Sequence, residues 1–279
     1  MAGARAFNRA RAKYSAAGAI LMFDTIIDPR FVRDVPLQYF PADAFPTIHP
    51  IFWLNSHFAV GGGSPLQRLS GMYTAHMTRI APRNGFTWHP HRGLEIFTWV
   101  LEGTLFHQDS TGGEGELKPG DVQRMFSGDL ILHQELNLTD DPVRVIQIWF
   151  AADRQYRKPP HYQQLNRTEL PSRTEGDSRV LSVFGDDSPL ERHMVGDARL
   201  TATFVSPCGK VELEPPRPDE NLFLYVTEGA GQLTTADDAT PLGQYDVLIA
   251  RADAQNVQLR AAGDRELHYL NFYLPKFLS

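Results

Sequence analysis

The sequence predicts an all-β protein made of two similar domains, and three observations lead to this fold class. The 279 residues include 22 glycines and 20 prolines, a content that favours many turns between short elements. Between these turns lie short stretches rich in alternating, β-branched and aromatic residues, as in antiparallel sandwiches and barrels. Strand-and-turn patterns of the first half also recur, in the same order, in the second half.

The first half contains a close succession of predicted strands. Residues 94–101 read Leu-Glu-Ile-Phe-Thr-Trp-Val-Leu, a composition typical of strands, and the Glu-Gly pair at 102–103 ends this strand. Residues 72–79 alternate in a pattern compatible with a strand that leads toward 85–91. The same reasoning predicts further strands at 104–109, 122–126, 130–135 and 143–150.

The repeat sets the expected domain boundaries. The segment WVLEG at 99–103 recurs as YVTEG at 225–229, an offset of 126 positions, and the Asp-Val pair at 121–122 recurs at 246–247, an offset of 125 positions. Two ordered matches at nearly one offset indicate two similar β-domains. We therefore predict four parts, namely an N-terminal extension at 1–35, a first domain at 36–155, a connection at 156–190 and a second domain at 191–279.

Composition and charge exclude several classes of protein. The formal charge of −6 provides no general basic surface, so direct nucleic-acid binding is not expected. Cys208 is the single cysteine, which excludes an intrachain disulfide and thiolate metal clusters. The apolar run at 16–23 is too short to span a bilayer, and no cleavage pattern of a signal peptide follows it. We expect a cytoplasmic protein without a membrane anchor, with Met22 as an alternative start of the native chain.

His89 and His91 form a His-x-His pair in one of the predicted strands. Side chains at i and i+2 of a strand share one face at a separation of roughly 6–7 Å, so both imidazoles can reach one metal ion. Pro90 between them lacks a backbone N–H, which favours an edge strand or a barrel mouth. Taken alone the pair is a weak signal, because ten histidines in this chain produce such spacings by chance.

His133 and Glu135 repeat this spacing 42 residues after His91. If the two strands are close together in one barrel, three imidazole nitrogens and one carboxylate oxygen converge and leave two coordination positions open. Such a set suits Fe(II), Mn, Ni, Co or Cu, and the open positions allow a substrate or dioxygen to bind the metal. His268 is the only histidine in residues 195–279, so the metal site is predicted in the first half alone.

These residues also carry a resemblance to a known family. The segment HPHRGLE at 89–95, VLEG at 100–103, His107-x-Asp109-Ser110, PGDVQ at 119–123 and His133-x-Glu135 resemble the pirin family of bicupins over about residues 70–150. The second half, with GDARL at 196–200, is similar more loosely to bacterial pirin-like quercetin dioxygenases. The resemblance implies two stacked antiparallel β-barrels, each a double-stranded β-helix, with short helices and one metal in the first barrel.

The resemblance further implies the ligands and the activity. It places the metal on His89, His91, His133 and Glu135, with Fe(II) as the expected ion and Mn, Ni, Co, Cu or Zn as alternatives. The implied activity is that of a quercetin 2,3-dioxygenase, in which a small aromatic flavonol and dioxygen are the partners and Glu135 is both ligand and catalytic base. The alternative is a non-enzymatic, iron-dependent regulatory binding protein, such as a transcription cofactor or redox sensor, with a protein partner. We expect a monomer or weak dimer.

Several neighbouring residues have two interpretations each. Glu95 occupies the place of the carboxylate ligand in ordinary cupins, so it either replaces Glu135 or pairs with a nearby Arg. His107 either orients a ligand or is an ordinary core or surface histidine. Arg92 covers the site electrostatically or is solvated. The aromatic residues near the pair line a substrate pocket or belong to the plain core, and they are Phe86, Trp88, Phe97, Trp99 and Phe126.

Overall fold

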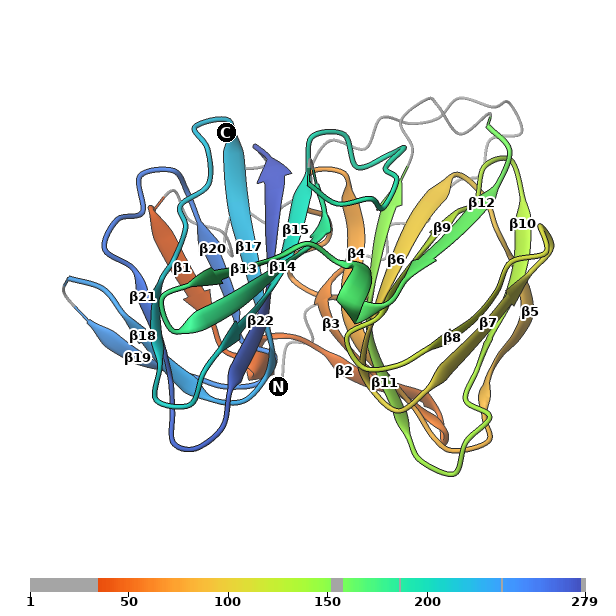
Figure 1. Ribbon diagram of the computed structural model, residues 1–279, viewed down its shortest axis with the longest axis horizontal. Helices are drawn as coiled ribbons and strands as arrows, with labels where there is room; N and C mark the ends of the chain where they lie inside the picture. Colours follow the sequence, from red (N-terminus) through yellow and green to blue (C-terminus); the bar gives the residue numbers. More distant parts are fainter. Residues whose placement is uncertain (1–34, 152–157, 186, 237, 277–279) are drawn as a thin grey trace, which may run out of the picture.

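The computed structural model describes residues 35–151, 158–185, 187–236 and 238–276. It consists of two β-barrels that lie side by side (Figure 1), so the predicted all-β bicupin architecture is confirmed. Two short 3-10 helices are present in these ranges, η1 (Ala42–Ala44) and η2 (Arg167–Glu169). Neither these helices nor any other helix of the described residues is long and apolar enough to cross a membrane. Most of the predicted extension, with Met22, lies outside the described residues.

Each barrel is closed by a seven-stranded sheet and a four-stranded sheet. In the first barrel the large sheet has the order β12-β9-β6-β11-β4-β3-β2 and the small sheet the order β5-β10-β7-β8. These strands are β2 (Thr47–Ile51), β3 (Leu54–Val60), β4 (Met72–Ile80), β5 (Gly85–His91), β6 (Leu94–Glu102), β7 (Leu105–Asp109), β8 (Glu114–Leu117), β9 (Val122–Phe126), β10 (Ile131–Leu136), β11 (Val143–Ala151) and β12 (His161–Leu165).

The second barrel repeats this arrangement. Its large sheet has the order β1-β20-β17-β22-β15-β14-β13 and its small sheet the order β16-β21-β18-β19. Its strands are β1 (Leu37–Phe40), β13 (Ser172–Glu175), β14 (Ser178–Phe184), β15 (Arg199–Val205), β16 (Lys210–Glu212), β17 (Glu220–Glu228), β18 (Gly231–Thr234), β19 (Ala239–Leu242), β20 (Val247–Ala250), β21 (Gln258–Ala261) and β22 (Leu267–Pro275).

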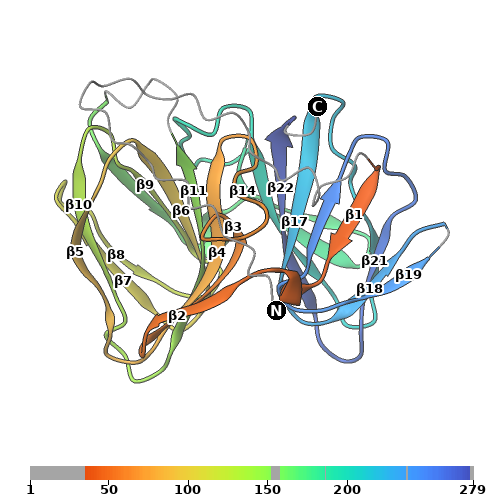
Figure 2. The ribbon, with the colours of Figure 1, turned by 180° about the vertical axis from the view of Figure 1, so that it is seen from behind.

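The strands cross between the barrels at both ends of the predicted first domain, so the sheets divide the chain differently from the predicted boundaries. β1 precedes the first barrel in sequence but pairs with β20 of the second, where Figure 2 shows it. The predicted connection at 156–190 is not a plain linker, because it contributes β12 to the first barrel and both β13 and β14 to the second. These crossings were not visible in the repeat, since short edge strands carry little pattern of their own.

The largest hydrophobic cluster lies between the two barrels. It joins side chains of the first large sheet, such as Phe97 and Phe150, to side chains of the second, such as Phe184 and Phe272. Phe97 and Phe184 pack with ring centroids 4.4 Å apart. Inside the first barrel the buried apolar residues form two small clusters, one around Val100 and Val145 and one around Ile96 and Ile131. The space between these small clusters holds polar side chains.

The interior of the second barrel is apolar at the corresponding place. Leu259 of β21 pairs with Val211 of β16 and Leu233 of β18, and all three belong to one buried aliphatic cluster. At the matching place in the first barrel, His133 of β10 pairs with His89 of β5 and with Asp109 of β7. The two barrels share a shape, and aliphatic packing in the second replaces the histidines of the first.

Candidate metal centre

The histidines of the two predicted pairs meet because β5 and β10 are antiparallel neighbours. His133 lies directly opposite His89, and Ile131 lies opposite His91. Alternation then points His89, His91 and His133 to the same face of the small sheet, toward the barrel interior. β5 is the edge strand of this sheet, which satisfies the expectation that Pro90 lies where no ladder hydrogen bond is required.

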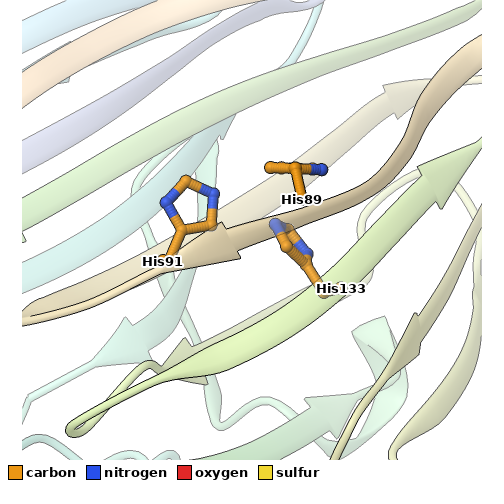
Figure 3. A group of neighbouring side chains, drawn as sticks. All are labelled: His89, His91 and His133. Carbon is orange, nitrogen blue, oxygen red and sulfur yellow. The ribbon is translucent and has the colours of Figure 1, made fainter.

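The three imidazoles form a compact cluster (Figure 3). One nitrogen from each of His89, His91 and His133 lies within 4.8 Å of the others. The ring centroids are 4.2 Å apart for His89 and His133, 4.9 Å for His91 and His133, and 5.0 Å for His89 and His91. This spacing allows three nitrogens to converge on one ion after small rotations of the rings.

The hydrogen bonds of these histidines fit a role as ligands. His89 Nδ1 lies 2.8 Å from the carbonyl oxygen of Thr87, which can only accept, so Nδ1 carries the proton and Nε2 keeps its lone pair. His133 is 2% exposed, yet neither of its ring nitrogens has a hydrogen-bond partner among the described residues. A buried polar side chain without a partner is costly, and a bound metal removes that cost.

Burial favours the neutral, metal-binding form of His91 and His133. It lowers the pKa of His133 to about 2, with smaller contributions from His89 and His91, and it lowers the pKa of His91 to about 4, with a contribution from His89. Burial also lowers the pKa of His76 to about 4, and this residue lies opposite Gln147 in the large sheet. A neutral imidazole needs no deprotonation before it coordinates, so the site is ready for a metal at neutral pH.

The metal-free protein should therefore lose stability in mild acid. The unfolded chain binds protons at His76 and His133 below about pH 6.5, while the folded chain does so only below about pH 4 and 2, so the free energy of unfolding falls as pH falls. Between pH 6.5 and 5 each histidine accounts for up to about 2 kcal/mol. Chelator-treated protein should melt at a lower temperature at pH 5 than at pH 7, and His133→Leu should reduce the difference. Equal melting temperatures at both pH values would contradict the buried neutral state.

Glu135 lies beside the three-histidine cluster but is not part of it. A β-bulge between His133 and Glu135 shifts the register against β5. Instead, one oxygen of the Glu135 carboxylate lies within 4.8 Å of a nitrogen of His107 and a nitrogen of His133. The two carboxylate oxygens accept hydrogen bonds of 2.7 Å from the side-chain amides of Gln123 and Gln147. The four-ligand set of His89, His91, His133 and Glu135 thus stays a prediction, which requires the Glu135 side chain to reach the other side of His133.

Glu95 is not a ligand, and the interpretation as an ion pair is the one that the structure supports. Its side chain and that of Arg124 are both fully buried, with Arg124 Nε 2.6 Å from Glu95 Oε1. The same carboxylate accepts the backbone N–H groups of His193 at 2.9 Å and Met194 at 2.6 Å. Glu95 therefore attaches the loop that contains His193 and Met194, here called the 190s loop, to the first barrel. This attachment lies outside the three-histidine cluster.

Of the aromatic residues expected around the site, Phe86 lies beside His89 with ring centroids 6.1 Å apart, and the others have other places. Phe97 and Trp99 pack between the barrels, and Phe126 packs against His193 with ring centroids 4.7 Å apart. Phe86 packs on the small cluster around Val100, while Trp88 is 52% exposed on the outer face. Arg92 is exposed.

Sequence reasoning did not single out Trp149, which also contacts the cluster. Trp149 packs edge-on against His91 with ring centroids 5.2 Å apart. Its Nε1 is buried without a partner in the described part of the chain. Trp149 lies on β11 two residues after Gln147, so the alternation of that strand was a usable signal for its inward direction.

Two stacked barrels with a histidine cluster inside one of them define a cupin-type metal protein. Residues 66–150 match the family model named Pirin. This segment therefore carries a pirin domain, and the predicted resemblance to the pirin family is confirmed.

Relatives among curated proteins agree with this family. A protein of Mycobacterium tuberculosis named "Putative quercetin 2,3-dioxygenase" is 36% identical over 169 residues, which cover 57% of this chain and 66% of that relative. A "Pirin-like protein" of Solanum lycopersicum is 27% identical over 199 residues, which cover 70% of this chain and 68% of that relative. The chain spans just under two thirds of the mycobacterial relative's length.

Solved structures show the same fold. YhhW from Escherichia coli superposes with a TM-score of 0.70 at 23% identity, covering 86% of this chain and 97% of that chain. A second structure of YhhW, described as a complex with nickel(II), has a TM-score of 0.69 at 22% identity, with 86% and 99% covered. A quercetin 2,3-dioxygenase from Acinetobacter baumannii has a TM-score of 0.67 at 18% identity, with 86% and 79% covered.

Proposed function

We propose that this protein is a metal-dependent dioxygenase that cleaves the heterocyclic ring of a flavonol such as quercetin. The observation that carries the proposal is the buried cluster of His89, His91 and His133, in which both nitrogens of His133 lack a partner within the described ranges. The names of the mycobacterial and Acinetobacter proteins support the choice of substrate class. The reaction consumes one dioxygen and releases one carbon monoxide per flavonol.

The residues of the first barrel have distinct roles in this proposal. The three histidines hold the ion, expected to be Fe(II), and Thr87 fixes the ring of His89 through its carbonyl oxygen. When bound, the metal would supply Lewis-acid and redox chemistry beside the flavonol. Glu135 is the proposed fourth ligand and base, because its carboxylate can accept the proton of the flavonol 3-hydroxyl.

Three polar side chains on the facing large sheet, those of Thr98, Gln123 and Gln147, support Glu135 in this role. Gln123 of β9 and Gln147 of β11 each donate one amide hydrogen bond to it, and Gln123 also lies 3.2 Å from the hydroxyl of Thr98. These two hydrogen bonds fix the position of the Glu135 carboxylate. Glu135, Gln123 and Gln147 are all buried, which limits the access of water.

An anaerobic binding experiment followed by exposure to air tests the proposal. Iron-loaded protein mixed with quercetin under argon should shift the visible absorption of the flavonol, and admission of air should cause oxygen uptake with release of carbon monoxide. His268→Ala, which removes a histidine of the second barrel, should behave like the wild type. An unchanged quercetin spectrum together with no oxygen uptake would contradict the proposed activity.

The non-enzymatic binding role has one observation in its favour. Trp88 of β5 and Leu132 of β10 are 52% and 42% exposed on the outer face of the strands whose inward side chains form the cluster. In this role, iron-loaded and metal-free protein should capture different partners and quercetin should not be consumed. The expected cytoplasmic location and the monomeric or weakly dimeric state stay predictions.

A further inference from the structure

A crevice between the two barrels lies apart from the histidine cluster. Its volume is about 160 Å³, and it is lined by residues of β6 in the first barrel and of β15, β17 and β22 in the second, which Figure 1 shows near the middle of the molecule. Arg167 of η2 and the turn before β9 complete its wall. Within the described ranges, the lining contains none of His89, His91 and His133. The two barrels therefore form this space together, outside the candidate metal centre.

The walls of the crevice suit an aromatic ring. The lining includes four residues with large apolar side chains, which are Trp99, Leu101, Phe204 and Leu270. An apolar cavity of about 150 Å³ is large enough to hold a benzene-sized molecule. Since the crevice has about this volume, it can accept one six-membered ring, whereas a flavonol, with its three rings, is too large for it.

Most of the polar side chains in the lining already have partners. Those with a hydrogen bond or an ion pair among the described residues are Thr203, Thr227, Glu228, His268 and Tyr269. The charge of Glu228 is balanced by an ion pair with Arg144 of the first barrel. His268 Nε2 lies 2.8 Å from a carboxylate oxygen of Glu266. These groups therefore leave little capacity for a polar ligand.

Arg167 is the exception in this lining. In the part of the chain that the structure describes, its guanidinium has no hydrogen bond or ion pair, and it lies over the ring of Phe204 with 4.9 Å between Cζ and the ring centroid. The backbone N–H of Arg167 donates to Asp121 Oδ1 at 2.9 Å. Gly120, at φ +89°, lets the side chain pass closely, because a Cβ there would lie 2.6 Å from Arg167 Cδ. Arg167 is thus held at the crevice with its charge unmatched.

We propose that the crevice binds a small aromatic carboxylate of the benzoate class. The planar guanidinium of Arg167 offers two parallel N–H donors that match the two oxygens of a carboxylate. The ring of the ligand packs against the apolar walls. A neutral aromatic molecule would leave Arg167 unmatched, and a small inorganic anion would leave the apolar walls without a contact, so the two features together select this class of ligand.

Fluorine NMR with 4-fluorobenzoate tests the site on the full chain. Titration should shift the ligand signal, and the neutral analogue 4-fluorobenzamide should bind about 10- to 100-fold more weakly, the factor expected for hydrogen bonds to a charged group. Arg167→Met should lower the affinity for the carboxylate by the same factor. The control Arg179→Met should leave it unchanged, because Arg179 lies over the same Phe204 ring, 5.0 Å from its centroid, but does not line the crevice.

The same titration separates this site from other sources of binding. Metal-loaded and chelator-treated protein should bind 4-fluorobenzoate equally, and inorganic phosphate at equal concentration should not displace it. Loss of binding on removal of the metal, displacement by phosphate, or equal binding of the amide would overturn the proposal. Unchanged affinity of folded Arg167→Met protein would do the same. No step involves quercetin or dioxygen, so the outcome is independent of the proposed function.

Discussion

His133→Ala should remove most of the metal affinity of the protein and leave both barrels folded. His133 is the most deeply buried member of the three-histidine cluster. Removal of groups that only support a ligand lowers metal affinity about 10- to 100-fold, so loss of this ligand should lower it by more than about 100-fold. Equilibrium dialysis against Fe(II) or Co²⁺ with elemental analysis measures this change.

The second barrel supplies a matched control for His133→Ala. Leu259 occupies the corresponding position opposite Val211, inside the aliphatic cluster. Leu259→Ala should lower the free energy of unfolding by about 2–5 kcal/mol, as for other large-to-small changes in cores, without any change in metal affinity. His133→Ala protein that keeps full metal stoichiometry and affinity would show that the ligand assignment is wrong.

Glu95→Ala should cause the largest loss of stability among single changes near the site. It leaves the fully buried guanidinium of Arg124 without its closest partner and removes the acceptor for the backbone N–H groups of His193 and Met194. Breaking a buried ion pair by removal of one partner costs about 3–5 kcal/mol. Urea unfolding of metal-free protein measures the difference, and metal stoichiometry under native conditions should stay unchanged.

An exposed ion pair is the control for this effect. Arg83 and Asp140 form a pair of 2.8 Å with side chains 61% and 84% exposed, so Asp140→Ala should lower the free energy of unfolding far less than Glu95→Ala. If Glu95→Ala changed stability no more than Asp140→Ala, the buried pair would not be what attaches the 190s loop. If it changed metal stoichiometry, the assignment of Glu95 outside the metal centre would be wrong.

The sequence predicted the ligand-bearing strands because their chemistry is local. A His-x-His pair needs only strand alternation to share a face, and the edge position of Pro90 follows from its missing N–H. The pairing of His133 with His89 needed the motif resemblance, because the two residues are 44 positions apart with four other strands between theirs. Register across such a distance is decided by tertiary packing.

The features that the sequence did not predict depend on contacts between distant segments. Glu95 has a partner 29 positions away in Arg124 and others 98 and 99 positions away in the backbone, and no pattern in its own strand indicates them. An extra residue of β5 between Phe86 and His89 places Glu135 opposite Phe86, and a bulge has no reliable sequence signal without glycine.

An anomalous-scattering experiment can locate the metal centre, which we propose to lie inside the first barrel alone. Crystals of cobalt-loaded protein, measured at the cobalt absorption edge, should show an anomalous difference peak among His89, His91 and His133. No peak should appear at Leu259 and Val211 in the second barrel. If the protein contained cobalt but all anomalous peaks lay outside the first barrel, the proposed position of the metal centre would be wrong.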